Sequence, residues 1–335
     1  MNAQPATTGV TDLDVMAGEL QSRDRFLLTT HEGPDGDALG SLLAMHLILG
    51  QLGKDSVMFL DASQFPLPLE YRFLPLTDVF HEAPADVVDR TLVFLDCGNI
   101  DRMPVEFLQR DGAHVLNIDH HHDNTRFGAV NLVEVSSSST AEIVWRLAKS
   151  LEAEITPPIA VALYVGLVTD TGKFMYENTD PDSHRMAAEL IEAGVNVDEI
   201  NRRLYERVPL EKTMLVARAI QSIQRFDDDR LALAYVADAD YEATGASELH
   251  TEGIIDHVRA LEGTLVAGVI RDKPDGGRTA RKVSLRSSDG SVDVSAIARE
   301  HGGGGHVRAA GFGTDLAYPE IVEFVRGEVA KQLDG

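Results

Sequence analysis

The chain of 335 residues is 44% hydrophobic and carries a formal net charge of −24 at pH 7. Its length exceeds what one ordinary core usually serves, so we expect two domains. The acidic balance argues against tight binding to long duplex nucleic acid, because that affinity comes largely from lysine and arginine side chains that release condensed counterions.

The sequence lacks the usual signals of membrane insertion and secretion. No window approaches the roughly 18 uninterrupted apolar residues of a membrane span, and residues 1–14 lack the apolar centre of a signal peptide. The single cysteine, Cys97, excludes an intrachain disulfide framework and a cysteine-based metal site. These features predict a cytoplasmic protein without a membrane partner.

Residues 24–170 alternate apolar strands with helical patterns, which is typical of right-handed βαβ units around a parallel sheet. The apolar segment 159–167 fits either a strand or a buried helix, because its periodicity does not distinguish the two. In chain order, the pattern predicts a strand at 26–28, a helix over 37–52, strands over 56–60, 91–96 and 114–118, and a helix that starts among 136–140.

The pattern changes after Gly172, where two helical stretches, 181–193 and 209–223, precede a return of strand-like runs. These runs lie at 231–236, 264–270 and 281–285. The expected fold class is therefore α/β, with a second, smaller α/β domain. The expected boundaries are 1–195 for a parallel-sheet N-terminal domain, 196–224 for a helical connector and 225–335 for the second domain.

Several apolar runs of the first domain end in carboxylates and imidazoles. In an open parallel sheet, ligands collect outside the carboxyl ends of the strands. Taken separately, each motif has an ordinary explanation, such as an Asp-Gly turn or a helix cap. Those explanations would have to place six such residues near one edge for unrelated reasons, so a common site is the better interpretation. The six are His31, Asp35, Asp37, Asp96, His120 and Asp170.

This set of side chains suits divalent metal ions. Carboxylates favour Mn²⁺ or Mg²⁺, and imidazoles move the preference toward Mn²⁺ without excluding others such as Co²⁺. The aspartates would repel one another strongly at close range unless two divalent cations neutralised them. Two ions roughly 3.5 to 4 Å apart can clamp a phosphoryl group during in-line displacement. The residues therefore predict a two-metal cluster.

The sequence resembles the DHH phosphoesterases, and more narrowly their DHHA1 subfamily, over nearly the whole chain. The similarity lies in residues 31–41, 95–97, 117–121, 138–142 and 169–174. Near the C-terminus, residues 302–306 and 309–312 look like the glycine-rich substrate motif of that family.

The resemblance assigns the metal ligands to two ions. It implies that His31, Asp35 and Asp96 hold one Mn²⁺, and that Asp37, Asp96, His120 and Asp170 hold the other, with Asp96 as the bridge. It also implies that Asp119 lies behind the ligands and orients His120, while His121 faces the scissile phosphate. His121 and Asp96 are thus the expected catalytic residues. His122 exceeds the family pattern, and a surface position is expected for it.

The second domain is expected to capture the substrate. Residues 271–308 hold eight basic and five acidic residues, a local excess of +3, although the charge pattern alone favours an ordinary solvated surface. The run of four glycines could be a flexible linker or an anion-binding concavity of backbone amides. Nearby basic residues and the family resemblance favour phosphate binding. The expected substrate contacts are Arg286, Gly303, Gly304, Gly305, His306 and Arg308.

The resemblance implies an Mn²⁺-dependent phosphoesterase that uses two-metal activation of water. Its expected substrates are short oligonucleotides, cleaved to mononucleotides, and 3'-phosphoadenosine 5'-phosphate (pAp), converted to AMP. The rival within the family is a phosphodiesterase of cyclic dinucleotides such as cyclic di-AMP, or of linear pApA. RecJ-like exonucleases are longer, and family II pyrophosphatases carry a different C-terminal domain. A noncatalytic nucleotide sensor is the rival from another class, and a homodimer is left open.

Overall fold

The computed structural model describes residues 11–103, 105–273 and 279–334. The chain divides into two compact units, residues 1–207 and 208–335, which we call unit 1 and unit 2. Among the described residues, no helix is both long enough and apolar enough to span a membrane.

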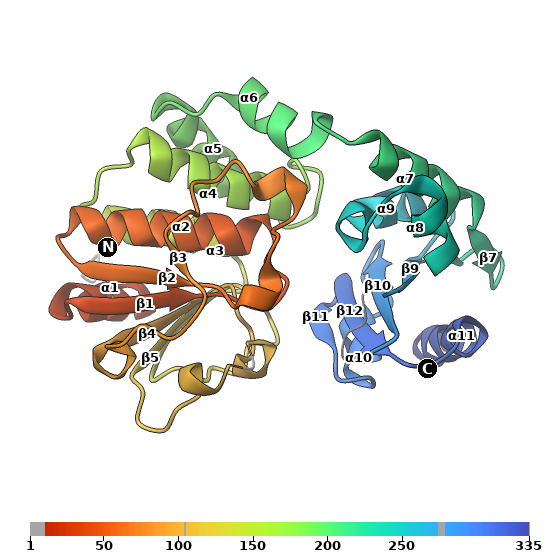
Figure 1. The fold of residues 1–335 in the computed structure, drawn as a ribbon, viewed down its shortest axis with the longest axis horizontal. Coiled ribbons are helices and arrows are strands. Elements are labelled where there is room, and N and C mark those ends of the chain that lie inside the picture. The colour runs from red at the N-terminus through yellow and green to blue at the C-terminus, as the bar shows by residue number, and fades with distance from the viewer. Residues whose placement is uncertain (1–10, 104, 274–278, 335) are drawn as a thin grey trace, which may run out of the picture. The chain divides into compact units, whose positions relative to one another are not determined.

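Unit 1 is built on a six-stranded sheet in the order β3-β2-β1-β4-β5-β6, in which every pair of neighbouring strands is parallel (Figure 1). The strands are β1 (Arg25–Thr29), β2 (Asp55–Phe59), β3 (Val79–Phe80), β4 (Thr91–Leu95), β5 (Val115–Asp119) and β6 (Val130–Val133). The helices are α1 (Asp12–Ser22), α2 (Gly36–Gln51), α3 (Thr140–Ser150), α4 (Pro157–Asp170), α5 (Pro181–Glu192) and α6 (Val197–Asn201). A π-helical turn, Arg202–Glu206, follows α6. The predicted parallel α/β fold is confirmed.

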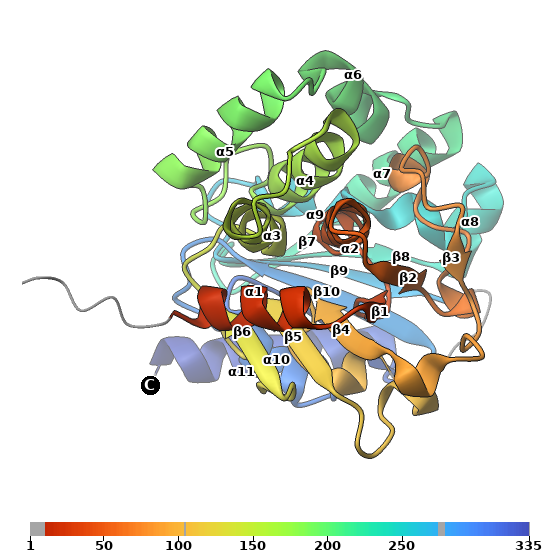
Figure 2. The ribbon, with the colours of Figure 1, turned by 90° about the vertical axis from the view of Figure 1, so that its left-hand side faces the viewer.

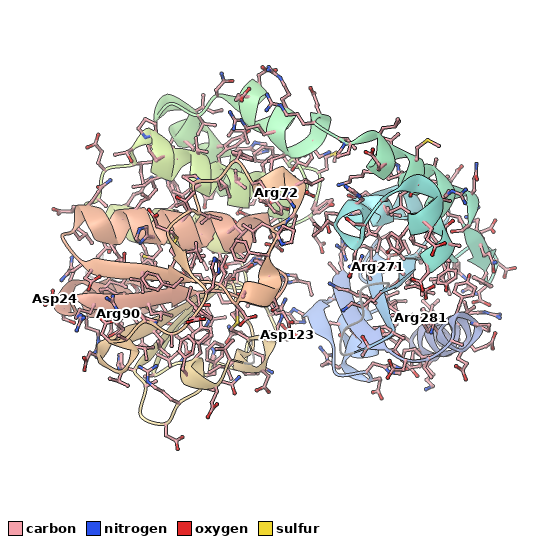
Figure 3. The ribbon with its side chains drawn as sticks, in the orientation of Figure 1. Asp24, Arg72, Arg90, Asp123, Arg271 and Arg281 are labelled. Atoms are coloured by element: carbon pink, nitrogen blue, oxygen red, sulfur yellow. The ribbon has the colours of Figure 1, made fainter. Side chains whose placement is uncertain are left out.

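The two faces of this sheet are covered differently. Because side chains alternate along a strand, Phe26 and Leu28 face the core formed with α2, α3 and α4, whereas Leu27 faces a smaller core beneath short 3₁₀ turns. Arg90 joins strands at their amino ends (labelled in Figure 3), since its guanidinium donates to the Phe26 carbonyl at 3.1 Å and to the Asp55 carboxylate at 2.9 Å. Arg90 therefore does not occupy the carboxyl ends of the strands.

Two helices of unit 1 refine the sequence prediction. Residues 159–167 lie within α4, which begins with two prolines and is buried along most of its length because α2, α3 and α5 pack around it. The sequence pattern did not predict α1. That helix buries only Met16, Ala17 and Leu20, and it packs next to β6 (Figure 2).

Unit 2 contains a mixed six-stranded sheet in the order β11-β12-β10-β9-β8-β7, in which only β8 and β9 are parallel neighbours. The strands are β7 (Gln224–Phe226), β8 (Leu231–Val236), β9 (Val266–Asp272), β10 (Arg281–Ser287), β11 (Gly304–His306) and β12 (Ala309–Thr314). The helices are α7 (Leu210–Gln221), α8 (Asp238–Thr244), α9 (Ile254–Arg259), α10 (Val294–Arg299) and α11 (Tyr318–Asp334). One core lies between the sheet and α7 to α9, and another between the sheet and α10 and α11. The predicted second α/β domain is confirmed.

We expect Gly40→Ala to destabilise unit 1. A Cβ atom at Gly40 would lie 2.4 Å from the Ala162 carbonyl oxygen and 3.0 Å from the Gly166 nitrogen, so α2 and α4 would have to separate. Overpacking of this kind costs about 1–3 kcal/mol of unfolding free energy. The matched control is Gly50→Ala in the same helix, where a Cβ atom meets nothing within 4 Å. That variant should gain about 0.5–1 kcal/mol. Denaturant unfolding of both variants checks the pair, and equal effects would contradict the close packing.

Candidate active site

The candidate site lies where the strand order of unit 1 reverses, between β1 and β4. Crevices at such switch points, outside the carboxyl ends of parallel strands, are the usual ligand sites of open α/β sheets. His31 follows β1, Asp96 follows β4 directly, and Asp119 is the last residue of β5. The three adjacent strands therefore bring these side chains to one edge, where all three are almost fully buried.

Asp37 reaches the same edge from the first turn of α2. Its carboxylate is 1% exposed and accepts hydrogen bonds from the Thr140 nitrogen at 2.7 Å and the Ala141 nitrogen at 2.9 Å. Because these amides open α3, they have no partner within that helix and suit a negative charge. The N-terminus of α3 is therefore directed at this carboxylate.

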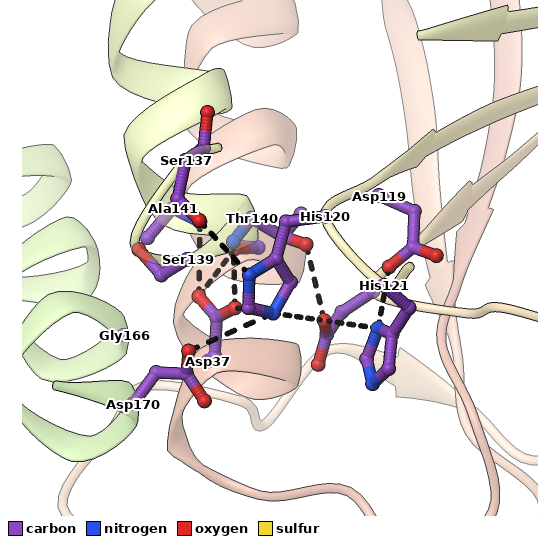
Figure 4. A network of polar contacts seen from close by, with 12 residues as sticks. Asp37, Asp119, His120, His121, Ser137, Ser139, Thr140, Ala141, Gly166 and Asp170 are labelled. Atoms are coloured by element: carbon purple, nitrogen blue, oxygen red, sulfur yellow. Dashed lines mark hydrogen bonds and ion pairs between the residues drawn. The ribbon is translucent and has the colours of Figure 1, made fainter. Parts of the chain in front are cut away.

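The His120 imidazole is surrounded by carboxylates (Figure 4). Its Nε2 lies 3.6 Å from Asp170, 3.7 Å from Asp96 and 3.9 Å from Asp37, while its Nδ1 lies 3.2 Å from the Ser137 carbonyl oxygen. Since a carbonyl only accepts, Nδ1 carries a proton. Nε2 therefore faces the three carboxylates, at distances too long for hydrogen bonds. This donor set fits a divalent cation between its atoms.

A second group of donors adjoins the first through Asp96. His31 Nε2 lies 3.6 Å from Asp96 Oδ2, and the donor atoms of His31, Asp35 and Asp96 all lie within 4.8 Å of one another. Asp35 is exposed, and its carboxylate caps α2 by accepting from the Asp37 nitrogen at 3.0 Å. Both groups have the donors that Mn²⁺ or Mg²⁺ favours, and the structure brings all six predicted ligands together.

Burial and the close approach of several carboxylates shift the pKa values of the aspartates in this cluster. Burial raises the pKa of Asp37 well above its ordinary value, and the Asp96 and Asp170 carboxylates raise it further. Burial also raises the pKa of Asp170 to about 6. Burial alone would raise the pKa of Asp96 too, but the neighbouring histidines, His31 first, hold it well below its usual range. The cluster therefore lacks positive charge, which divalent ions would supply.

The expectation that Asp119 orients His120 is wrong. The Asp119 carboxylate accepts a hydrogen bond from His121 Nδ1 at 2.7 Å, and its other oxygen accepts from Asn124 Nδ2 at 2.5 Å. The Ser137 carbonyl orients His120 instead. Successive residues point to opposite sides as the strand ends, so Asp119 shares a side with His121, two positions later. His122, the additional histidine, is exposed.

Two residues that sequence reasoning missed also contact the ligands. The Thr140 hydroxyl donates to Asp96 Oδ1 at 3.0 Å, and the Asn178 amide donates to Asp170 Oδ2 at 3.1 Å. Thr140 lies in residues 138–142, which carry part of the family resemblance, so its position near the site could have been predicted from the sequence. Asn178 lies outside every recognised motif, and only the fold brings it to the site.

The predicted substrate contacts of unit 2 lie on its sheet. Arg286, on β10, lines a polar pocket of about 110 Å³ together with Lys282, Ser284, Glu252 and the Arg271 that Figure 3 labels. Thr251, Gly253, Ile255 and Val269 complete the lining. The guanidinium of Arg308 instead donates to the carbonyls of Ser288 at 3.4 Å and Asp289 at 3.0 Å. The pocket thus combines three basic side chains with one acidic side chain.

The glycine run is part of the sheet and not a linker. Gly304, Gly305 and His306 form β11, which pairs with β12. A Cβ atom at Gly303 would lie 2.2 Å from the Gly311 carbonyl oxygen, and one at Gly305 would lie 2.4 Å from the Ala309 carbonyl oxygen. Glycine is therefore required here for close approach of the backbone.

Known proteins resemble this chain over almost its full length. Residues 25–167 match the DHH family, N-terminal domain, and residues 228–331 match the DHHA1 domain. A bifunctional oligoribonuclease and PAP phosphatase from Thermus thermophilus is 36% identical over 317 residues, covering 91% of this chain and 90% of that protein. A protein of the same name from Bacillus subtilis is 24% identical, covering 86% of this chain and 88% of that protein.

Solved structures share the fold. The crystal structure of an exopolyphosphatase-related protein from Bacteroides fragilis aligns with a TM-score of 0.83 at 21% identity and covers 98% of each chain. The family match and the relatives define a hydrolase of phosphoric ester bonds, which the fold and the site fit. Within that class, the chain belongs to the DHH family and carries a DHHA1 domain, as its motifs predicted.

We expect the metal-free protein to lose stability as the pH rises from about 5 to about 9, above the acidic range in which the lowered pKa values of Asp96 and Asp119 act in the opposite direction. A carboxyl whose pKa is raised by folding stabilises the fold fully below its unfolded pKa of 3.8, and for Asp170 this contribution is lost as the pH rises through about 6. Burial alone would lower the pKa of His120, but the surrounding carboxylates raise it to about 9. Its contribution is therefore present below 6.5 and is lost as the pH rises through about 9. The unfolding temperature of chelator-treated protein measures the trend.

Asp170→Asn is the matched control, because it removes one titrating carboxyl. Its unfolding temperature should decline less steeply than that of the wild type between about pH 4 and pH 7. Added Mn²⁺ should raise the unfolding temperature of the wild type most at high pH. Parallel curves for the two proteins would contradict the assigned shift.

Proposed function

We propose that this chain is a divalent-metal-dependent phosphoesterase that hydrolyses short oligonucleotides to mononucleotides and pAp to AMP. The observation that carries the proposal is the convergence of six carboxylate and imidazole ligands at one sheet edge. The 36% identity to the Thermus thermophilus oligoribonuclease and PAP phosphatase, over 91% of this chain, supports the choice of substrates. All of the expected ligands are present, which argues against a noncatalytic sensor.

Two Mn²⁺ ions are the proposed cofactors, with Asp96 shared between them. The geometry of Asp96 supports the bridging role, because its Oδ2 lies 3.6 Å from His31 Nε2 while its Oδ1 lies 3.7 Å from His120 Nε2. One set of ligands would be His31, Asp35 and Asp96, and the other Asp37, Asp96, His120 and Asp170. Such ions supply Lewis-acid stabilisation of the charge that develops on a phosphoryl group, and they lower the pKa of water.

His121 is proposed to contact the scissile phosphate. Burial by itself would lower the pKa of this imidazole, but the Asp119 carboxylate raises it above the ordinary value. Asp119 also fixes the orientation of the ring through the 2.7 Å contact at Nδ1. A protonated His121 would donate a charge-assisted hydrogen bond to a phosphoryl oxygen as negative charge increases there.

Unit 2 is proposed to hold the nonreacting phosphate of the substrate. The pocket on its sheet is lined by Arg271, Lys282 and Arg286, with Ser284 between the last two on β10. Guanidinium forks bind phosphate oxygens in pairs, and a hydroxyl adds a further donor. Gly303, Gly304, Gly305, His306 and Arg308 remain proposed contacts for another part of the substrate.

The test of this function is a turnover panel on one preparation, with and without Mn²⁺. It comprises pApA, pAp, short RNA, short DNA, cyclic di-AMP and pyrophosphate. We expect turnover of pApA, short RNA and pAp, with initial rates that fall as the oligonucleotide lengthens, since the net charge of −24 repels long polyanions. Fastest turnover of cyclic di-AMP, or equal rates on long single strands, would contradict the proposal.

Asp96→Ala should cause the largest loss among the single ligand variants, because one carboxylate serves two ions. Turnover should fall by about 10²-fold or more, the typical effect of losing one contact that stabilises the transition state. Metal content of the purified protein should fall in parallel. Asp182→Ala, at a carboxylate that is 61% exposed on α5, is the control and should retain both metal and turnover. Two bound ions and near-normal turnover in Asp96→Ala would refute the bridge.

Arg286→Ala should weaken substrate use and leave the metal content unchanged. A charge-assisted hydrogen bond contributes roughly 1.5–3 kcal/mol, so kcat/KM on pApA should fall about 10- to 100-fold. A small artificial phosphodiester without the second phosphate should be affected less. Arg299→Ala, on α10 at the other face of the same sheet, is the control. An equal loss on both substrates, or a loss of metal, would show that Arg286 supports the fold instead.

A further inference from the structure

A short segment at the start of α3 contacts most of one proposed ligand set. We call residues 137–141 the α3 entry segment. Its Thr140 and Ala141 amides donate to Asp37, its Thr140 hydroxyl donates to Asp96, and its Ser137 carbonyl accepts from His120 (Figure 4). Three of the four ligands proposed for one ion are thus held by five consecutive residues.

Asn178 connects the fourth ligand to the same segment. Its Nδ2 lies 3.1 Å from Asp170 Oδ2, 3.1 Å from the Asp170 carbonyl oxygen and 2.7 Å from the Ser138 carbonyl oxygen. Among the described residues, its Oδ1 is buried and has no hydrogen-bond partner. An unpaired buried acceptor costs about 1–3 kcal/mol. The flipped side-chain amide would cost more, because its Oδ1 would then face the three acceptor oxygens that Nδ2 now contacts. The Asn178 amide nitrogen therefore holds Asp170 against the α3 entry segment.

The α3 entry segment is itself fixed by local hydrogen bonds. The Ser139 hydroxyl caps α3 by accepting from the Glu142 nitrogen at 3.2 Å, and the Glu142 carboxylate accepts from the Ser138 nitrogen at 2.8 Å. These residues are at most 4% exposed. Gly166 of α4 allows the close approach, since a Cβ atom there would lie 2.7 Å from Asp37 Oδ1. Each member of this ligand set therefore has a hydrogen-bond partner that holds it before any ion binds.

The other proposed ligand set, His31, Asp35 and Asp96, is held mainly by hydrogen bonds to residues close in sequence. His31 Nδ1 lies 2.9 Å from the carbonyl oxygen of Glu32, its own neighbour. The Asp35 side chain is exposed, and its carboxylate caps the helix that follows it. An exposed ligand that must also serve as a helix cap has more freedom to lose on binding an ion than a buried ligand with fixed partners.

We propose that Thr140 and Asn178 are positioning residues that make the Asp37, Asp96, His120 and Asp170 set the tighter of two divalent-ion positions, which is therefore filled first. The inference rests on the proposed two-metal function and adds an order of binding. Activity then follows occupancy of the weaker position, formed by His31, Asp35 and Asp96. Partners behind metal ligands typically contribute about 10- to 100-fold in metal affinity.

The experiment is a Mn²⁺ titration of the chelator-stripped full chain, with free Mn²⁺ followed by electron paramagnetic resonance. The wild type should bind two ions with distinguishable affinities. Thr140→Val and Asn178→Ala should each weaken the tighter ion by about 10- to 100-fold and leave the weaker one unchanged. Thr140→Ser keeps the hydroxyl and should restore the wild-type affinity. His31→Ala should lose the weaker ion and keep the tighter one.

Controls separate positioning from folding. Asn131→Ala removes an amide that bonds the Gly128 backbone at 2.7 Å, so it matches Asn178→Ala in chemistry and should leave both affinities unchanged. Unfolding temperatures of the metal-free Thr140→Val and Asn178→Ala proteins should equal that of the wild type within a few degrees. With excess Mn²⁺, both variants should recover most of the wild-type kcat.

The outcomes are distinguishable. An unchanged tighter ion in both variants, selective loss of the weaker ion, or equal weakening of both ions would overturn the inference. Failure of Thr140→Ser to restore affinity would also count against it, because the hydroxyl would then not be the operative group. A wild-type chain that binds no divalent ion would refute the metal centre of the proposed function itself.

Discussion

Mutual repulsion among buried carboxylates is the constraint on which this molecule depends. Asp37 and Asp96 are almost fully buried beside Asp170, within 3.9 Å of one imidazole nitrogen. Burial first, and the neighbouring carboxylates after it, raise the pKa of Asp37 and Asp170. Such an arrangement persists only if the surrounding structure compensates it, or if cations do. The same charge density that would weaken a metal-free fold would give the proposed site its affinity for divalent ions.

The parallel sheet and its helices supply that compensation. The strand order reverses between β1 and β4 beside the candidate site, and the N-terminus of α3 directs two amides at Asp37. Close contact of α2 with α4 depends on Gly40 and Gly166, whose missing side chains leave room for backbone atoms and for the Asp37 carboxylate. Packing and electrostatics are thus coupled in unit 1, because Gly166, which lets α2 and α4 approach, also leaves room for the Asp37 carboxylate.

Unit 2 gathers basic side chains at its pocket, whereas unit 1 gathers carboxylates at its site. The pocket of unit 2 holds three basic side chains on β9 and β10 in a chain whose net charge is −24, so the pocket would attract a phosphate group while the net charge of the chain repels polyanions. In the proposed function, chemistry at phosphorus and recognition of a distant phosphate would be carried by separate cores. The glycine run at 302–305 serves the sheet of this unit, since β11 must pass close to β12.

The sequence by itself determined the longer apolar strands, the α/β class and the six candidate ligands, because apolar runs and the polar residues that follow them are local patterns. It did not predict β3, β6, β7, β11 or β12, which are short, partly exposed or rich in glycine. It left residues 159–167 open between strand and helix, since a segment surrounded by helices is apolar on every side. Only the tertiary structure decided that Asp119 serves His121, and that Thr140 and Asn178 reach Asp96 and Asp170. Those pairings depend on strand-end geometry and on contacts between distant segments, which no local pattern records.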